Sequence, residues 1–164
     1  MSEEIFPIVN TLGEVIGSAT RSECHNHSFL LHPVVHLHIF NTKGEIFLQK
    51  RVMTKKIQPG KWDTAVGGHV DFGENIEDAL LRETREELGV IDFVPEFLLS
   101  YEFRSEIEVE LVYVYKCIYE GNFDFDPLEV SEGRFWSWSE IKNSIGKAVF
   151  TPNFESEIKR LNWI

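Results

Sequence analysis

The stretch that decides the fold runs from Gly68 to Val90 and reads GHVDFGENIEDALLRETREELGV. Its glycines and charged residues follow the spacing G-x5-E-x7-R-E-x-x-E-E-x-G, and an aliphatic residue comes next. Asn75 is a good helix N-cap and Gly89 a natural helix end, so the pattern predicts a helix over 76–88. The side of this helix that we expect to face a core carries Leu80, Leu81, Thr84 and Leu88.

The same helix gathers like charge on a neighbouring arc. Glu83 lies three residues from Glu86 and four from Glu87. Like charges at these spacings, in the C-terminal half of a helix, each cost a few tenths of a kcal/mol in water. A solvated acidic face with an ordinary Arg82–Glu86 ion pair would tolerate the charge, but it leaves the fixed glycine spacing unexplained. A hard divalent cation, which takes oxygen ligands, would explain both.

The segment resembles the Nudix box, G-x5-E-x7-R-E-U-x-E-E-x-G-U, where U is a bulky aliphatic residue. Thr84, at the first U position, is the single departure. The resemblance implies a Mg²⁺- or Mn²⁺-dependent hydrolase that cleaves a diphosphate linkage in a small molecule of the nucleoside diphosphate-X type. It implies that Arg82 orients carboxylates and that the metal ligands are the Gly68 carbonyl, Glu83, Glu86 and Glu87. Which glutamate acts as the general base stays open, and Glu74 is expected to be structural.

A further carboxylate from outside the box completes the site in several Nudix enzymes. Glu106, Glu108 and Glu110 alternate at the start of a predicted strand, so all three should point to one face. A charged strand edge would look the same. Glu110 is the candidate metal ligand, because an apolar run follows it directly.

Two pairs of residues on predicted strands need an interpretation. Lys50 and Arg51 end a strand, where basic residues commonly contact phosphate in related domains, and they are the candidates for diphosphate binding. A charged strand end explains them about as well. His36 and His38 share one face of a strand, and we expect hydrogen bonds to satisfy them without a metal.

The stretches LLHPVVHLHIFNTKGEIFLQKR and PGKWDTAVGGH resemble the isopentenyl-diphosphate isomerase branch of the same superfamily. That branch also needs a catalytic cysteine just before the Gly-His pair, where this chain has Gly67, and neither Cys24 nor Cys117 replaces it by position. Without that thiol, protonation should be badly impaired, so hydrolysis is favoured over isomerisation. The branch holds a divalent metal with three histidines and two glutamates, and the corresponding candidates for a second metal site are His25, His32, His69, Glu108 and Glu110.

A third interpretation is a non-catalytic module that senses nucleotides. Nudix-like sensors often accompany a DNA-binding domain and can lack box glutamates. This sequence shows neither feature.

The composition limits the class of protein. The 164 residues suffice for one domain, and 43% are hydrophobic, as in globular proteins. The net charge of −11, with no basic stripe, argues against nucleic acid as the partner. Two widely spaced cysteines give no disulfide framework, and we expect a cytoplasmic protein with no signal peptide. No apolar run approaches about 18 residues, so no membrane span is expected.

The order of predicted elements favours an α+β fold. The resemblance makes this a Nudix α/β/α sandwich on a mixed sheet, with the box as a loop-helix-loop. We expect residues 1–30 to form an N-terminal hairpin extension packed on the core, with strands over 4–10 and 14–19, and residues 31–164 to form the Nudix domain. The hairpin is the candidate surface for a homodimer. The other predicted strands cover residues 34–40, 46–50, 62–66, 93–103, 108–119 and 134–138, with helical segments near 21–27, 139–144 and 152–161.

Overall fold

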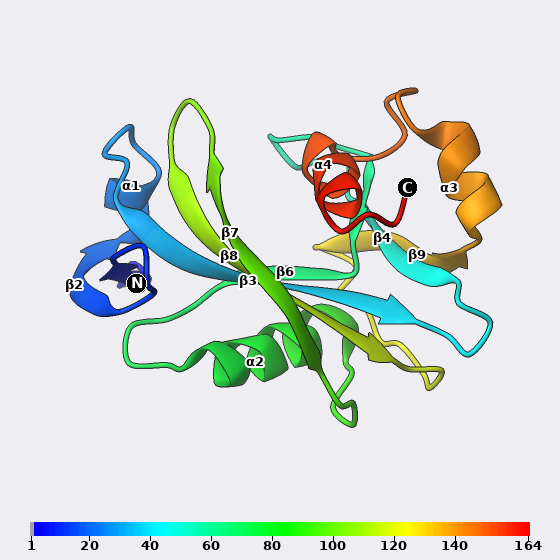
Figure 1. Cartoon of the computed structure of the whole chain (residues 1–164), viewed down its shortest axis with the longest axis horizontal. Helices are drawn as coiled ribbons and strands as arrows, with labels where there is room; N and C mark the ends of the chain where they lie inside the picture. The colour runs from blue at the N-terminus through cyan, green and yellow to red at the C-terminus, as the bar shows by residue number, and fades with distance from the viewer. Residues whose placement is uncertain (1) are drawn as a thin grey trace.

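The computed structural model describes residues 2–164 and shows a mixed sheet between two helical layers (Figure 1). Helix α2 covers one face, and α4 covers part of the other. The strands are β1 Ile5–Val9, β2 Val15–Thr20, β3 Leu31–Phe40, β4 Ile46–Arg51, β5 Trp62–Thr64, β6 Val66–His69, β7 Glu96–Arg104, β8 Val109–Ile118 and β9 Val130–Trp136. The helices are α1 Arg21–Cys24, α2 Ile76–Leu88, α3 Trp138–Ser144 and α4 Pro152–Arg160.

Strand β3 is the centre of the seven-stranded sheet. It runs parallel to β8 along its whole length, from the pair Leu31–Val109 to the pair Phe40–Ile118. It pairs antiparallel with β4 and with β6, while β7 pairs antiparallel with β8. Strands β5 and β9 both pair with β4. The mixed sheet and the α+β class agree with the prediction.

The segment that was expected to be one strand over 62–66 is two strands. β5 pairs with β4, and β6 crosses to pair with β3. The change of partner occurs at Ala65, whose carbonyl accepts a hydrogen bond from Gln49 Nε2 at 2.8 Å. A side chain thus satisfies a backbone group that the sheet ladder leaves unpaired at the crossing.

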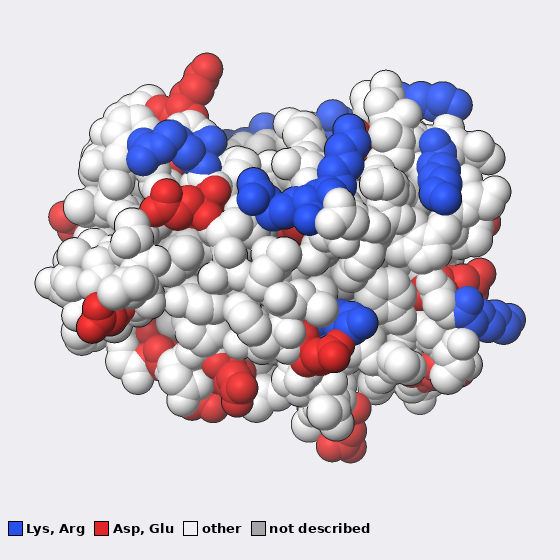
Figure 2. Space-filling model, in the orientation of Figure 1, with Lys and Arg blue, Asp and Glu red and all other residues white. Residues whose placement is uncertain are grey.

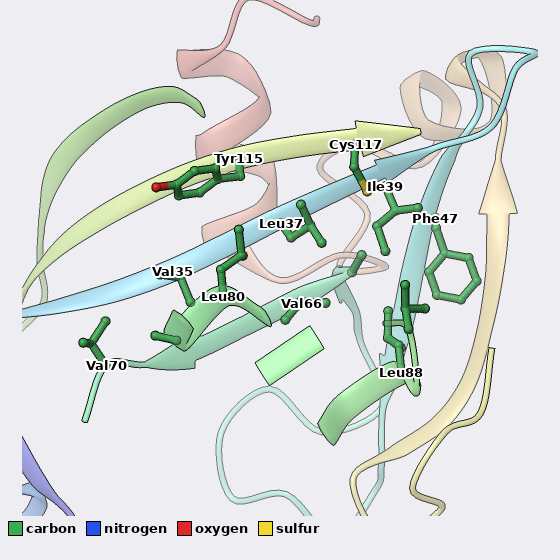
Figure 3. Close-up of a cluster of buried hydrophobic side chains, with 13 residues drawn as sticks. Val35, Leu37, Ile39, Phe47, Val66, Val70, Leu80, Leu88, Tyr115 and Cys117 are labelled. Atoms are coloured by element: carbon green, nitrogen blue, oxygen red, sulfur yellow. The ribbon is translucent and has the colours of Figure 1, made fainter. Parts of the chain in front are cut away.

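Helix α2 has the predicted bounds and the predicted caps. Asn75 Oδ1 accepts from the Asp78 N–H at 2.8 Å, and Gly89 adopts the left-handed conformation with φ 66°. Its buried residues are Ala79, Leu80, Thr84 and Leu88. Ala79, Leu80 and Leu88 belong to a core cluster with residues of β3 and β6, in which Figure 3 labels Leu80 and Leu88. The expectation for Leu81 was wrong, because its side chain is 43% exposed. Ala79 is buried in place of Leu81, and the other three residues of the predicted stripe are buried as expected.

The second face of the sheet carries another core. Trp62, Trp136 and Ile46 pack there with Phe150 and with Phe154 of α4. Trp62 is therefore part of this core. α4 also buries a charged residue, Glu157.

The N-terminal hairpin of β1 and β2 forms as predicted. Phe6, Ile8, Ala19 and Cys24 make a small core of their own, and the Phe72 N–H donates to the Ile5 carbonyl at 2.9 Å. This bond ties the hairpin to the loop that leads into α2. Within residues 2–164, no helix has the length and apolar character needed to span a membrane.

Candidate metal and diphosphate site

Glu83 of α2 lies directly against the backbone of Gly68 on β6. A Cβ atom built at Gly68 would lie 2.5 Å from both Cγ and Oε2 of Glu83, a distance that real Cβ contacts do not reach. Glycine is therefore required here to let the carboxylate reach the strand. The arrangement brings a backbone carbonyl and a carboxylate, two of the predicted ligands, to one place.

Arg82 connects the carboxylates of the box. Its guanidinium donates to both oxygens of Glu74 at 2.8 and 2.9 Å, to Glu83 Oε1 at 2.9 Å and to Glu86 Oε2 at 3.3 Å. It also donates to the His69 carbonyl at 3.0 Å, which fixes β6 relative to the helix. The bond to Glu74 is the main reason that the pKa of Arg82 is raised. Arg82 thus orients carboxylates, and Glu74 supports it.

Glu87 reaches into the sheet and is only half satisfied. Its Oε1 accepts from Gln49 Nε2 at 3.0 Å, whereas its buried Oε2 has no hydrogen-bond partner in the described part of the chain. Burial raises the pKa of Glu87 to about 8 and also raises the pKa of Glu83. An unsatisfied buried carboxylate oxygen costs about 1–3 kcal/mol or more. A divalent cation would satisfy this oxygen and favour the ionised form, so the donor set fits the metal that the box implies.

A small pocket opens beside Glu87, with a volume of about 100 Å³. Arg51 is part of its wall, with Nη1 3.6 Å from Asp63 Oδ2. Lys50, the other candidate for phosphate binding, is not among the described lining residues. The pocket is lined by His36, Gln49, Arg51, Asp63, Thr64, Gly67, Glu87 and Asn153.

A second cluster forms around His69 at the end of β6, from residues far apart in the sequence. The Nε2 atoms of His25 and His32 lie 2.8 and 3.7 Å from Glu108 Oε2. Glu110 Oε2 lies 4.0 Å from His32 Nε2 and 3.8 Å from His69 Nε2. The strands explain the meeting, because β3 pairs His32 with Glu110 of β8 and pairs Val34 with His69 of β6.

This His/Glu cluster fits a metal ion. The Nε2 atoms of His32 and His69 are buried without a hydrogen-bond partner among residues 2–164, and His25 Nε2 and Glu108 Oε2, although 2.8 Å apart, do not have hydrogen-bond geometry. Two ligands at about 2.1 Å from a common ion lie about 3.0 Å apart when adjacent and about 4.2 Å apart when opposite, which is the observed range. Burial lowers the pKa of each histidine, which leaves the imidazoles neutral as metal ligation requires.

One expectation about the glutamates was wrong. Glu106 lies in the turn before β8 and is exposed, so it does not share a strand face with Glu108 and Glu110. Glu110 lies among the histidines, and burial raises its pKa to about 7. Among the described residues, the groups of three ligand atoms within 4.8 Å of one another occur in this cluster and not on α2.

The N-terminal hairpin covers the His/Glu cluster. The ring of Phe6 stacks on His69 with centroids 4.5 Å apart and parallel planes, and it also stacks on His32 at 5.8 Å. The hairpin extension is therefore in contact with the candidate second metal site.

Charge is distributed unevenly over the surface. In Figure 2, acidic side chains gather along the lower part of the view, where α2 and the adjoining loops lie, while most Lys and Arg side chains lie along the upper part. A larger apolar groove of about 1310 Å³ is lined by Phe40, Ile91, Trp138 and their neighbours. Within the described part of the chain, none of the candidate metal or phosphate ligands lines it. The candidate residues are therefore concentrated around β6 and α2 and not at this groove.

Comparison with known proteins identifies the family of this chain. Residues 30–154 match the sequence profile of the NUDIX domain. The chain belongs to the Nudix family. Isopentenyl-diphosphate Delta-isomerase 2 of Photorhabdus laumondii is 30% identical over 168 residues, which cover 98% of this chain and 94% of that protein. An uncharacterized Nudix hydrolase of Streptomyces coelicolor is 31% identical over 162 residues, covering 98% and 89%. A solved structure from Deinococcus radiodurans has a TM-score of 0.81 at 25% identity, covering 96% of this chain and 98% of that one.

The family and the intact box make this chain a Nudix hydrolase, an enzyme class that acts on pyrophosphate linkages with divalent metals. The sequence interpretation missed several residues of the pocket beside Glu87. Gln49, Asp63 and Asn153 line the pocket, yet each is a single polar residue with no spacing that marks it. The contact of Phe6 with His69 and His32 could not be predicted either, because the sequence of the hairpin does not indicate which rings Phe6 stacks on.

Proposed function

We propose that this Nudix hydrolase cleaves the diphosphate linkage of a nucleoside diphosphate-X type small molecule, with Mg²⁺ or Mn²⁺ as its cofactor. The observation that supports it most directly is the unpaired, buried Oε2 of Glu87 beside a pocket that also contains Arg51. A carboxyl group in that condition needs a neighbouring cation to be ionised at neutral pH, and a guanidinium at the pocket wall suits a phosphate.

Each named residue has a task in this proposal. Gly68, Glu83, Glu86 and Glu87 would hold the cation or cations, which supply Lewis-acid activation of the diphosphate and of the attacking water. Arg82 keeps the carboxylates in place through its bonds to Glu74 and Glu83. A glutamate of the box accepts the proton of the water, and the side chain that does so is one of Glu83, Glu86 and Glu87.

The His/Glu cluster would hold a second ion in the same enzyme. Its ligands would be His25, His32, His69, Glu108 and Glu110. Imidazole ligands favour a transition metal over Mg²⁺, so Mn²⁺ or Zn²⁺ suits this site better than the carboxylates of α2. Glu110 then belongs to the second ion and not to the box.

A specific observation also favours isopentenyl-diphosphate isomerisation as the second candidate. The His/Glu cluster gathers the residues that the isomerase branch would use, and an isomerase relative covers nearly the whole chain. Against it stands Gly67, at the position where that branch needs a thiol. Cys24 and Cys117 are both buried in cores, and burial raises their pKa values to about 11 and about 12, so neither supplies a reactive thiolate.

A substrate panel tests the proposal. The purified protein is incubated with Mg²⁺ or Mn²⁺ and with nucleotide sugars, dinucleoside polyphosphates, nucleoside diphosphates and isopentenyl diphosphate. We expect release of a nucleoside monophosphate from at least one nucleotide and no dimethylallyl diphosphate from the isoprenoid. Conversion of isopentenyl diphosphate alone would establish the isomerase, and tight nucleotide binding without turnover would establish a sensor.

A further inference from the structure

A buried network of charge connects α4 to the candidate site. Glu157 of α4 is only 1% exposed, yet it carries three hydrogen-bond partners. Its Oε1 lies 2.7 Å from His36 Nδ1 and 2.6 Å from the hydroxyl of Tyr101, and its Oε2 lies 2.6 Å from His38 Nε2. A buried carboxylate is tolerated only when it is paired in this way.

His36 and His38 each bond Glu157 through one ring nitrogen, and they differ in what surrounds the rest of the ring. His38 is fully buried and packs against the ring of Trp163 at 4.9 Å. His36 keeps 19% of its side chain exposed and lines the same pocket as Glu87 and Arg51. A Cβ at Gly67 would lie 3.5 Å from His36 Cδ2 and 3.7 Å from Nε2. The bare backbone of Gly67 therefore lies beside the His36 edge that is not bonded to Glu157.

The ion pair with Glu157 favours the protonated, positively charged form of the His36 ring. Burial acts to lower the pKa of His36, but the contact with Glu157 outweighs it and raises the pKa to about 9. Glu110 and Asp63 act in the same direction from β8 and β5. The pKa of Glu157 is held well below its ordinary value by the two histidines, in spite of burial. The pair is thus ionised at neutral pH, and His36 Nε2 carries a proton that it can donate.

We propose that His36 donates a hydrogen bond from Nε2 to a phosphate oxygen of the substrate, and that Glu157 is the positioning residue that orients the ring. The proposal rests on the proposed diphosphate hydrolase and assigns one wall of its pocket. His36 and Arg51 present donors from the strands β3 and β4, while Glu87 presents its unpaired oxygen from α2. A phosphate group between them would meet cationic donors on one side and the metal-binding carboxylate on the other.

Two substitutions of His36 distinguish its bond to Glu157 from its contact with the pocket. The amide of Asn ends at the distance of ring Nδ1, so His36→Asn can keep the bond to Glu157 while it removes the atom that faces the pocket. The amide of Gln extends to the distance of Nε2, so His36→Gln returns a neutral donor to the pocket. His38→Asn is the matched control, because its shorter amide does not reach the position of Nε2 and so removes a bond to the same carboxylate, at a residue that does not line the pocket.

The probe is methylenediphosphonate, a diphosphate analogue that hydrolysis cannot cleave, with its affinity measured by calorimetry in excess Mg²⁺. Loss of a charge-assisted hydrogen bond should weaken its binding about tenfold to a hundredfold in His36→Asn. His36→Gln should recover part of that loss, and Glu157→Gln should weaken binding through disorder of the ring. His38→Asn should lower the melting temperature yet change the affinity less than twofold.

Turnover gives the second readout. For any substrate of the panel, KM should rise about tenfold or more in His36→Asn, while kcat changes less than KM, because the diphosphate carries its charge before the reaction begins. An unchanged affinity and an unchanged KM in a folded His36→Asn protein would overturn the role of His36. Binding that depends on His36 without any hydrolysis would uphold it and refute the hydrolase. A wild-type protein that neither binds the analogue nor turns over the panel would refute both.

Discussion

The carboxylate of Glu83 lies so close to the backbone of Gly68 that a single carbon added to this glycine would overlap it. A Cβ at Gly68 would come 2.5 Å from Glu83 Oε2. We predict that Gly68→Ala pushes the carboxylate out of the site and lowers kcat/KM about tenfold or more, since small displacements at a catalytic group are costly. Steady-state kinetics of the folded variant check this.

Gly17→Ala is the control for that change. Gly17 lies in the hairpin with nothing within 4 Å of a built Cβ, and we expect it to keep wild-type kinetics. A Gly68→Ala enzyme with the same kcat/KM as Gly17→Ala would show that the contact with Glu83 has no part in turnover.

The second prediction concerns Arg82, whose planar fork binds both oxygens of Glu74 while it also contacts Glu83. Lysine is a point charge that cannot reproduce this geometry. Arg82→Lys should lower the free energy of unfolding by about 1–3 kcal/mol, because these carboxylates are mostly buried. Urea denaturation measures it.

Arg85→Lys is the matched control on the same helix. Arg85 is exposed, and the conservative change should leave stability within about 0.5 kcal/mol of wild type. If both substitutions changed the free energy of unfolding equally, the bonds of Arg82 to Glu74 and Glu83 would have no special part in stability.

The third prediction follows from Glu87. Its pKa in the folded, metal-free protein is raised to about 8, above the ordinary value that it has when unfolded. Between those two pKa values the native state holds a proton that the unfolded state has lost, so this group lowers stability as pH rises from about 4.5 to 8. Glu87→Gln should therefore melt at least about 2 °C higher than wild type in EDTA at pH 8, and should differ less from it at pH 5. A lower melting temperature for the variant in EDTA at pH 8 would show that the carboxylate is already satisfied without a cation.

The fourth prediction distinguishes the two metal sites. Co²⁺ bound by imidazoles gives visible absorption, and we expect His69→Gln to abolish it because three of the five proposed ligands of that ion are histidines. Glu83→Gln should leave the spectrum unchanged, because Glu83 lies on α2 outside the His/Glu cluster. Loss of the same bands in both variants would mean that one shared ion is bound.

Local signals explain which parts of the fold could be predicted from the sequence. Asn75 and Gly89 determine both ends of α2, and the bonds that form there are short-range. The break at Ala65 could not be predicted in this way, because it depends on which strands the two halves pair with. Leu81 was assigned to the core because periodicity alone cannot tell which edge of an apolar stripe meets the sheet.

The residues of the candidate site were likewise predictable only where a local spacing marks them. Arg82, Glu83 and Glu87 were predictable because the box fixes their spacing on one helix. Glu157 carries no such mark, since it meets His36 across 121 residues of chain and only the packing of α4 on the sheet brings them together. The hydrogen-bonded state of His36 and His38 was expected, but the pocket that His36 lines depends on Gly67, which is bare where a side chain would cover the ring.

The central claim is that the carboxylates of α2 hold the cation that diphosphate hydrolysis requires. Its most direct test is the Mg²⁺-dependent kcat of wild type and of Glu87→Gln, measured side by side on the best substrate of the panel. The account predicts a fall of about a hundredfold or more in a variant that remains folded, because the amide cannot replace an anionic ligand. A kcat within a factor of two of wild type would contradict it.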